Sequence, residues 1–141
     1  MEEFKMEEVI LGGIKYRPHK NGGGLVAETA SVAETAYVGK EAMVMDKAKV
    51  YDQARILDQA VIAGEAEVYG KAEVSEKARV FDQAKVFDQA KVYGNARIGG
   101  QAKVYGRARV GGFVEFSGTA EVCGKAKYEG NFFVAVDKHG C

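Results

Sequence analysis

The sequence predicts an all-β fold in which one chain winds into a parallel β-solenoid, and three observations lead to this prediction. Residues 24–131 divide into eighteen consecutive hexads with no insertion or deletion, of which Ala84-Lys-Val-Phe-Asp-Gln89 is typical. Position one is Ala, and position three is Val or Ile, in sixteen hexads each. Position five is Gly in nine hexads and Asp in five. A coil that bends every six residues accounts for all three observations.

Each hexad is expected to form one short strand followed by a tight turn. Two apolar residues separated by one variable residue follow the alternation of a strand, whereas a helix would scatter positions one and three over different faces. Gly and Asp tolerate a left-handed backbone at low cost, which suits position five to the turn. Successive coils would then pair their strands in parallel, and the Ala and Val side chains would fill the bore.

The two end segments lie outside the repeat and are predicted to cap it. An uncovered solenoid exposes strand edges and open core at both ends. The run from Val9 to Tyr16, with Gly12-Gly13 at its centre, suggests a small hairpin over the first coil. The run Phe-Phe-Val-Ala-Val at 132–136 suggests a strand over the last coil. The predicted organisation is an N-terminal cap at 1–23, the repeat at 24–131, and a C-terminal cap and tail at 132–141.

The periodicity alone leaves the length of one coil open between 18 and 12 residues. An 18-residue coil aligns four aromatic residues at position four: Tyr51, Tyr69, Phe87 and Tyr105. A 12-residue coil aligns another four equally well: Tyr69, Phe81, Tyr93 and Tyr105. The charges at position two favour 18 slightly, because Lys49, Glu67 and Lys85 would then alternate in sign along one column.

The tandem Ala-x-Val-x-Gly/Asp-x hexads resemble the hexapeptide-repeat superfamily over about three quarters of the chain. This resemblance implies a left-handed parallel β-helix of about six coils, each with three short strands. More narrowly, the segment Gly23-Gly24-Leu-Val-Ala-Glu-Thr-Ala30-Ser-Val32 resembles the YdcK-like group of bacterial and phage proteins. Gly or Asp stands two residues after the aliphatic residue, as in that group, whereas acyltransferases of the superfamily usually have Gly directly after it.

Charge and composition exclude several classes of function. Twenty Lys and Arg balance twenty Asp and Glu, so no overall field draws the protein to nucleic acid or to an anionic membrane. No apolar run approaches a membrane span, and the opening residues are acidic where a secretion signal needs basic ones. Cys123 and Cys141 are too few for a disulfide scaffold and are interpreted as free thiols. We therefore expect a cytoplasmic protein with no membrane partner and no specific nucleic-acid partner.

The sequence offers little for catalysis, and we predict a protein that is not an enzyme and needs no cofactor or metal. The family resemblance implies that enzymes of this fold act between the subunits of a trimer, with a histidine as base. The two histidines, His19 and His139, lie in opposite end segments, and the unbroken register leaves no place for a lid. The alternative function is acyl transfer by a trimer, with His19 as the catalytic base.

Three outward columns are candidate binding or contact surfaces in an 18-residue coil. Aromatic side chains can hold bases, sugars or apolar groups, although an aromatic ladder also stabilises neighbouring coils with no ligand. A mostly basic column can accept phosphates, and an apolar strip suggests a subunit contact or a surface covered by the N-terminal segment. The aromatic column is Tyr51, Tyr69, Phe87 and Tyr105; the basic column is Arg55, Lys91, Arg109 and Lys127, interrupted by Glu73; the apolar strip is Leu25, Met43 and Val61, flanked by Met45.

The expected function is binding through the outward face. A chain with no inserted loop varies only at positions two, four and six, so specificity would have to come from these positions. We expect the partner to be an unknown protein or a small anionic ligand, and the protein to be a homo-oligomer, either a dimer or a trimer. The YdcK-like resemblance suggests a phage or mobile-element origin.

Overall fold

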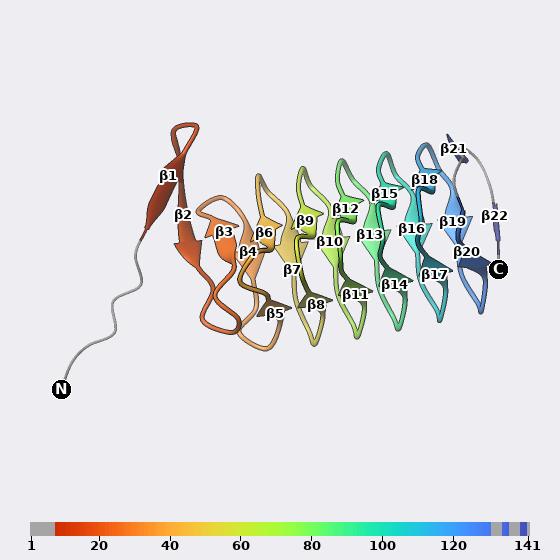
Figure 1. The fold of residues 1–141 in the computed structure, drawn as a ribbon, viewed down its shortest axis with the longest axis horizontal. Coiled ribbons are helices and arrows are strands. Elements are labelled where there is room, and N and C mark those ends of the chain that lie inside the picture. Colours follow the sequence, from red (N-terminus) through yellow and green to blue (C-terminus); the bar gives the residue numbers. More distant parts are fainter. Residues whose placement is uncertain (1–7, 131–133, 136–138, 141) are drawn as a thin grey trace.

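The protein is an all-β parallel solenoid with three strands in each coil, as the sequence predicts (Figure 1). The structure is a computed structural model that describes residues 8–130, 134–135 and 139–140. The described residues contain strands and turns and no helix. Successive coils follow one another along a single axis, with the β1–β2 hairpin at one end and β21 and β22 at the other.

Each of the three sides of the coil is one sheet. Sheet A consists of β1 (Val9–Leu11), β2 (Ile14–Pro18), β3 (Leu25–Ala27), β6 (Met43–Val44), β9 (Val61–Ile62), β12 (Arg79–Val80), β15 (Arg97–Ile98), β18 (Glu115–Phe116) and β21 (Val134–Ala135). Sheet B consists of β4 (Ser31–Val32), β7 (Lys49–Val50), β10 (Glu67–Val68), β13 (Lys85–Val86), β16 (Lys103–Val104), β19 (Glu121–Val122) and β22 (His139–Gly140). Sheet C consists of β5 (Tyr37–Val38), β8 (Arg55–Ile56), β11 (Glu73–Val74), β14 (Lys91–Val92), β17 (Arg109–Val110) and β20 (Lys127–Tyr128).

The coil length is 18 residues. Within the repeat each strand pairs in parallel with the strand three hexads away, as when Glu67 of β10 lies beside Lys85 of β13. The same spacing recurs in all three sheets, for example between Arg79 and Arg97 and between Lys91 and Arg109. The slight preference that the position-two charges gave to 18 residues is therefore confirmed, and the 12-residue alternative is wrong.

Small and branched side chains fill the bore. Ala84 and Val86 are fully buried, as are the equivalent Ala and Val or Ile side chains of the central coils. No polar or charged residue is buried in the described part of the chain, so the core is apolar throughout. Two larger side chains occupy position three near the C-terminal end, where the Phe116 and Tyr128 rings meet edge to face at 5.3 Å.

Position five makes the corner of each hexad with a left-handed backbone. Eight corner glycines of the repeat and six acidic corner residues have positive φ, and the acidic ones lie between 54° and 61°. The acidic corners are Asp46, Asp52, Asp58, Glu76, Asp82 and Asp88. The prediction that Gly and Asp serve as turn residues is confirmed, and Glu76 shows that a longer carboxylate can also occupy such a corner.

A hairpin adds to the first coil, as the N-terminal sequence suggests. Strands β1 and β2 pair antiparallel, and β2 pairs antiparallel with β3, so the hairpin extends sheet A. The segment that follows covers the edge of sheet C, because Asn21 O accepts the Val38 N–H and Gly24 N–H donates to Val38 O, each at 3.0 Å. Only glycine fits at position 24, since a Cβ there would lie 2.2 Å from Gly39 O.

The C-terminal segment continues the parallel stacking. Strand β21 pairs in parallel with β18, and β22 pairs in parallel with β19. Residues 131–133, 136–138 and 141 of the predicted C-terminal cap lie outside the described residues, as do residues 1–7 of the N-terminal one.

The prediction of free thiols is wrong for Cys123, which is disulfide-bonded. Two cysteines can be bridged only where their Cα atoms come within about 7 Å of each other, a distance that residue counting does not reveal. Disulfides are typical of oxidising compartments. The cysteines therefore no longer support the expectation of a cytoplasmic protein.

Candidate functional site

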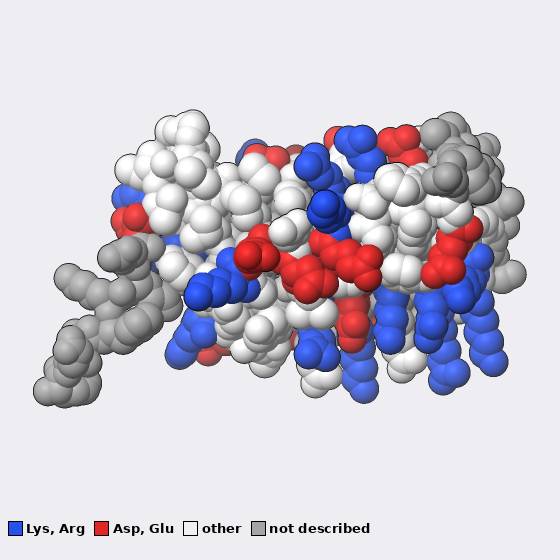
Figure 2. Space-filling view, in the orientation of Figure 1, with Lys and Arg blue, Asp and Glu red and all other residues white. Residues whose placement is uncertain are grey.

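Three cations stack in register on the C-terminal half of sheet C. Lys91, Arg109 and Lys127 are direct neighbours across β14, β17 and β20, and all three are exposed. We call these three residues the cation ladder. Figure 2 shows Lys and Arg side chains gathered along the lower edge of the C-terminal half, where these strands lie in Figure 1.

The lower part of the predicted basic column is neutralised. Arg55 of β8 forms an ion pair with Glu73 of β11, with 3.7 Å between Arg55 Nη1 and Glu73 Oε2. Glu73 is also the direct neighbour of Lys91. At the other end, Lys127 Nζ lies 3.8 Å from Glu129 Oε1. The unpaired positive charge of the column is therefore concentrated at its C-terminal half, and Arg55 is set apart from it.

Two more cations border the same face. Arg107 and Lys125 occupy position six, two residues before Arg109 and Lys127, and both are exposed. On sheet B, side chains at positions six and two line one groove together, so the same positions on sheet C flank each other in the same way. Sequence reasoning considered position two alone and missed these residues. The signal was present, since positions six and two are both outward and enclose the inward position one.

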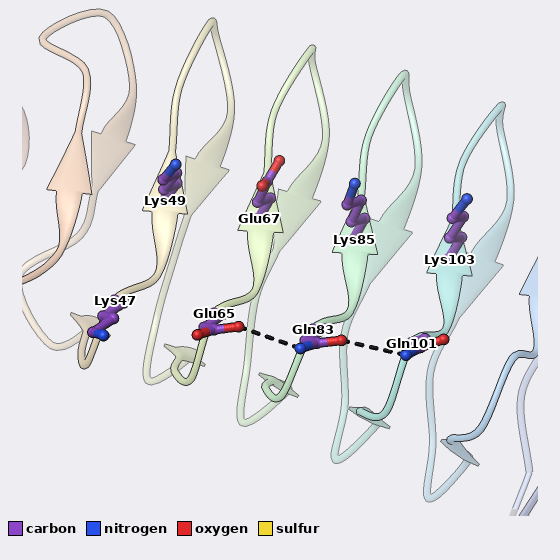
Figure 3. A pocket seen from close by; sticks show the side chains of 8 residues that line it. All are labelled: Lys47, Lys49, Glu65, Glu67, Gln83, Lys85, Gln101 and Lys103. Atoms are coloured by element: carbon purple, nitrogen blue, oxygen red, sulfur yellow. Dashed lines mark hydrogen bonds between the residues drawn. The ribbon is translucent and has the colours of Figure 1, made fainter.

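The groove on sheet B has mixed charge and a volume of about 530 Å³ (Figure 3). Amide and carboxylate groups form a ladder along one side, where Gln83 donates to Glu65 at 3.3 Å and Gln101 donates to Gln83 at 3.4 Å. The other side carries one position-two side chain from each coil, namely Lys49, Glu67, Lys85 and Lys103. Glu65 and Glu67 offset the lysines of this groove, so it lacks the concentrated positive charge of the cation ladder.

The predicted aromatic column is a continuous stack. Tyr51, Tyr69, Phe87 and Tyr105 lie with ring centroids 4.8–5.0 Å apart and planes within 2° of parallel. Because the ring faces between neighbours contact each other, they are not open to a stacked base or sugar. This geometry favours the reading in which the column stabilises neighbouring coils.

The tyrosines at the ends of the stack are tied to sheet B. Tyr51 donates to Glu67 Oε1 at 3.1 Å, and Tyr105 donates to Glu121 Oε1 at 3.0 Å. Burial, followed by the hydrogen bond to Glu67, raises the pKa of Tyr51 to about 12. The hydrogen bond to Glu121, followed by burial, raises the pKa of Tyr105. These tyrosines therefore stay neutral and bridge coils at physiological pH.

The predicted apolar strip is continuous on the N-terminal half of sheet A. Leu25, Met43 and Val61 are direct neighbours across β3, β6 and β9, and they and Met45 are half-buried. Strand β2 lies beside β3 within the sheet. The strip thus shares a sheet with the N-terminal hairpin.

His19 takes part in the N-terminal cap. Its Nε2 lies 2.9 Å from Ala36 O, to which it donates in the matching tautomer, and Asn21 Nδ2 donates to the same oxygen at 3.2 Å. The other histidine, His139, lies in β22 at the opposite end of the solenoid. The described residues contain no group of three or more His, Cys, Asp or Glu side chains arranged to hold a metal ion.

The fold and these surfaces place the chain in the class of parallel β-solenoid repeat proteins. No protein-family model, curated protein or solved structure matches it. Among the described residues there is no helix of the length and apolar character needed to cross a membrane.

Proposed function

We propose that this chain is a non-enzymatic β-solenoid that binds an anionic ligand through its outward face, at the C-terminal half of sheet C. The cation ladder is the observation that carries the proposal. Like charges directly opposite each other in a sheet are destabilising. A face that stacks Lys91, Arg109 and Lys127 without an intervening carboxylate therefore gains most from an anion that lies across it.

The uniform interior supports a binding role. The bore is filled by repeated Ala and Val side chains, so differences between coils are confined to outward positions. Arg and Lys at such positions recognise phosphate and carboxylate groups, Arg through two parallel hydrogen bonds and Lys as a point charge. The partner is therefore a small anionic ligand or a protein that presents acidic groups.

The proposal is tested by melting the protein in the presence of a panel of anions that includes nucleotides. An anion at a hundred times its Kd should stabilise the protein by about 2.7 kcal/mol. The triple variant Lys91→Gln, Arg109→Gln, Lys127→Gln should lose this shift. A matched variant, Lys49→Gln, Lys85→Gln, Lys103→Gln, removes the same charge from sheet B and should keep it. Absence of a shift with every anion, together with no partner captured from lysate, would contradict the proposal.

The acyl-transfer alternative depends on His19 as a base. The Nε2 of His19 is engaged by Ala36 O within the cap, which gives this residue a structural role and leaves only Nδ1 for chemistry. Turnover of acetyl-CoA that disappears in His19→Ala would favour acyl transfer over binding.

Membership of the hexapeptide-repeat superfamily and of its YdcK-like group, with a left-handed coil and a phage or mobile-element origin, is part of the proposal. The 18-residue coil and the corner at position five support the superfamily. We further propose a dimer or trimer that buries the apolar strip of Leu25, Met43, Met45 and Val61, because half-buried apolar side chains gain from further burial. A solution mass equal to one chain would contradict the oligomer.

A further inference from the structure

The acidic corners of the solenoid show how an anion sits on this backbone. At six corners a carboxylate oxygen accepts the N–H of the residue one coil further on, at 2.9–3.1 Å. In the corner column that borders sheet C, Asp52 binds the N–H of Gly70, and Asp88 binds the N–H of Gly106. The coil therefore repeats an oxyanion position that its own side chains fill in these places.

Glycine leaves this position vacant in the C-terminal coils. Gly106 has no side chain, so the Gly124 N–H directly beyond it has no carboxylate partner in the described part of the chain. A Cβ at Gly106 would lie 2.8 Å from Gly124 N, which shows how closely this N–H approaches the corner below. The Gly118 N–H beyond Gly100 is open in the same way.

Charge distinguishes these two open corners. Arg107 follows Gly106 and Lys125 follows Gly124, and both side chains are exposed. The equivalent residues at the Gly100–Gly118 corner are Gln101 and Thr119, which carry no charge. Arg109 and Lys127 of the cation ladder lie two residues beyond Arg107 and Lys125.

The surface is hollowed along this column. A groove of about 390 Å³ follows the corners and ends at Gly106 and Arg107. Its other lining residues are Gly70, Lys71, Asp88 and Gln89. The Asp88 carboxylate is already engaged by the Gly106 N–H, so the vacant oxyanion position is the one at Gly124.

We propose that the corner formed by Gly106 and Gly124 binds a phosphate group. One phosphate oxygen accepts the Gly124 N–H in the place that Asp88 Oδ2 takes one coil earlier, and the others pair with Arg107 and Lys125. A dianion with three free oxygens matches one N–H and two cations better than a carboxylate does. This inference rests on the proposed function and names the ligand class and the central site of the same face.

The test follows the amide resonances of the full chain during titration with inorganic phosphate at constant ionic strength. The Gly124 amide should shift and saturate, while the Gly118 amide should not. Gly106→Asp places a carboxylate on the Gly124 N–H, as Asp88 does on Gly106, and should weaken phosphate binding by at least about tenfold, because a charge-assisted hydrogen bond is lost. The matched control Gly100→Asp fills the uncharged corner and should change the affinity by less than about twofold.

Both variants reproduce an Asp–Gly pair that the chain already contains at Asp52–Gly70 and Asp88–Gly106. If Gly106→Asp nevertheless fails to fold, Arg107→Gln with Lys125→Gln tests the same site and should weaken phosphate by a similar factor. A Gly124 amide that does not respond, or a folded Gly106→Asp protein that binds as the wild type does, would overturn the inference. An equal shift with acetate would overturn the assignment to phosphate.

The outcome for the corner is separable from that for the proposed function. If the triple variant of the cation ladder loses anion binding while Gly106→Asp keeps it, the corner site is wrong and the binding face stands. If the wild-type protein binds no anion, both fail.

Discussion

The N-terminal and C-terminal halves of the solenoid share one interior and differ in surface chemistry. Residues 1–70 contain twelve acidic and eight basic residues, and residues 71–141 contain eight acidic and twelve basic ones. The corners change in the same direction, from Asp46, Asp52 and Asp58 in the first half to Gly112, Gly118 and Gly124 near the end. The bore does not change, so the two halves show that stability and surface charge are set by different positions of the hexad.

The largest expected effect comes from a charge in the shared bore. Val86→Asp should destabilise the protein by about 3–5 kcal/mol or unfold several coils, because it buries an unpaired charge in a fully apolar core. Urea denaturation followed by circular dichroism measures the change. The neighbouring outward variant Lys85→Asp should cost less than about 1 kcal/mol. Equal effects of the two variants would show that the bore is not the common core of both halves.

The aromatic stack joins the two halves, and its central ring is the next most sensitive position. Phe87→Ala should cost about 2–3 kcal/mol, because it removes contacts with both Tyr69 and Tyr105. The control Phe87→Tyr keeps the ring and should stay within about 0.5 kcal/mol of wild type. A Phe87→Ala protein with unchanged stability would mean that the stack does not couple the coils.

The corners are expected to matter less than the core. Asp52→Ala should cost about 1–2 kcal/mol, because Gly70 N–H loses its acceptor and Ala must adopt a φ of 60°. Asp52→Asn should cost less, since Asn tolerates this backbone and its side-chain oxygen can still accept the bond. Thermal unfolding compares the two, and a larger loss for Asn than for Ala would contradict the role assigned to the carboxylate.

The smallest effect is a loss of stability at alkaline pH. The pKa of Tyr51 in the first half and of Tyr93 in the second are each raised to about 12, mainly by burial and then by hydrogen bonds to Glu67 and Glu129. An unfolded tyrosine ionises near pH 10, so the contribution is complete below about pH 10 and is lost as the pH rises toward 12. Urea denaturation at pH 9 and pH 11 should show the decrease.

Replacing the tyrosine of either half separates the two contributions. Tyr51→Phe and Tyr93→Phe should each flatten the pH dependence, because phenylalanine does not ionise. A decrease that is unchanged in both variants would assign the alkaline instability to other groups.

The candidate surfaces were partly predictable from the sequence. The aromatic column, the apolar strip and the upper basic column all lie where an 18-residue coil puts them. The pairing of Arg55 with Glu73 and the closed faces of the stacked rings could not be anticipated, because they depend on contacts between residues 18 apart. Arg107 and Lys125 were missed because only one outward position was considered, although the hexad already placed them beside Arg109 and Lys127.

The sequence by itself determined the strand, the corner and the inward residues, because these depend on alternation and backbone preference within six residues. Ala84 and Val86 could be assigned to the bore, and Asp88 to a turn, without knowledge of any neighbour. Only the tertiary structure decided that three hexads close one coil. That closure determines which outward side chains become neighbours, and therefore why Gly124 N–H, unlike Gly106 N–H, finds no carboxylate in the coil below.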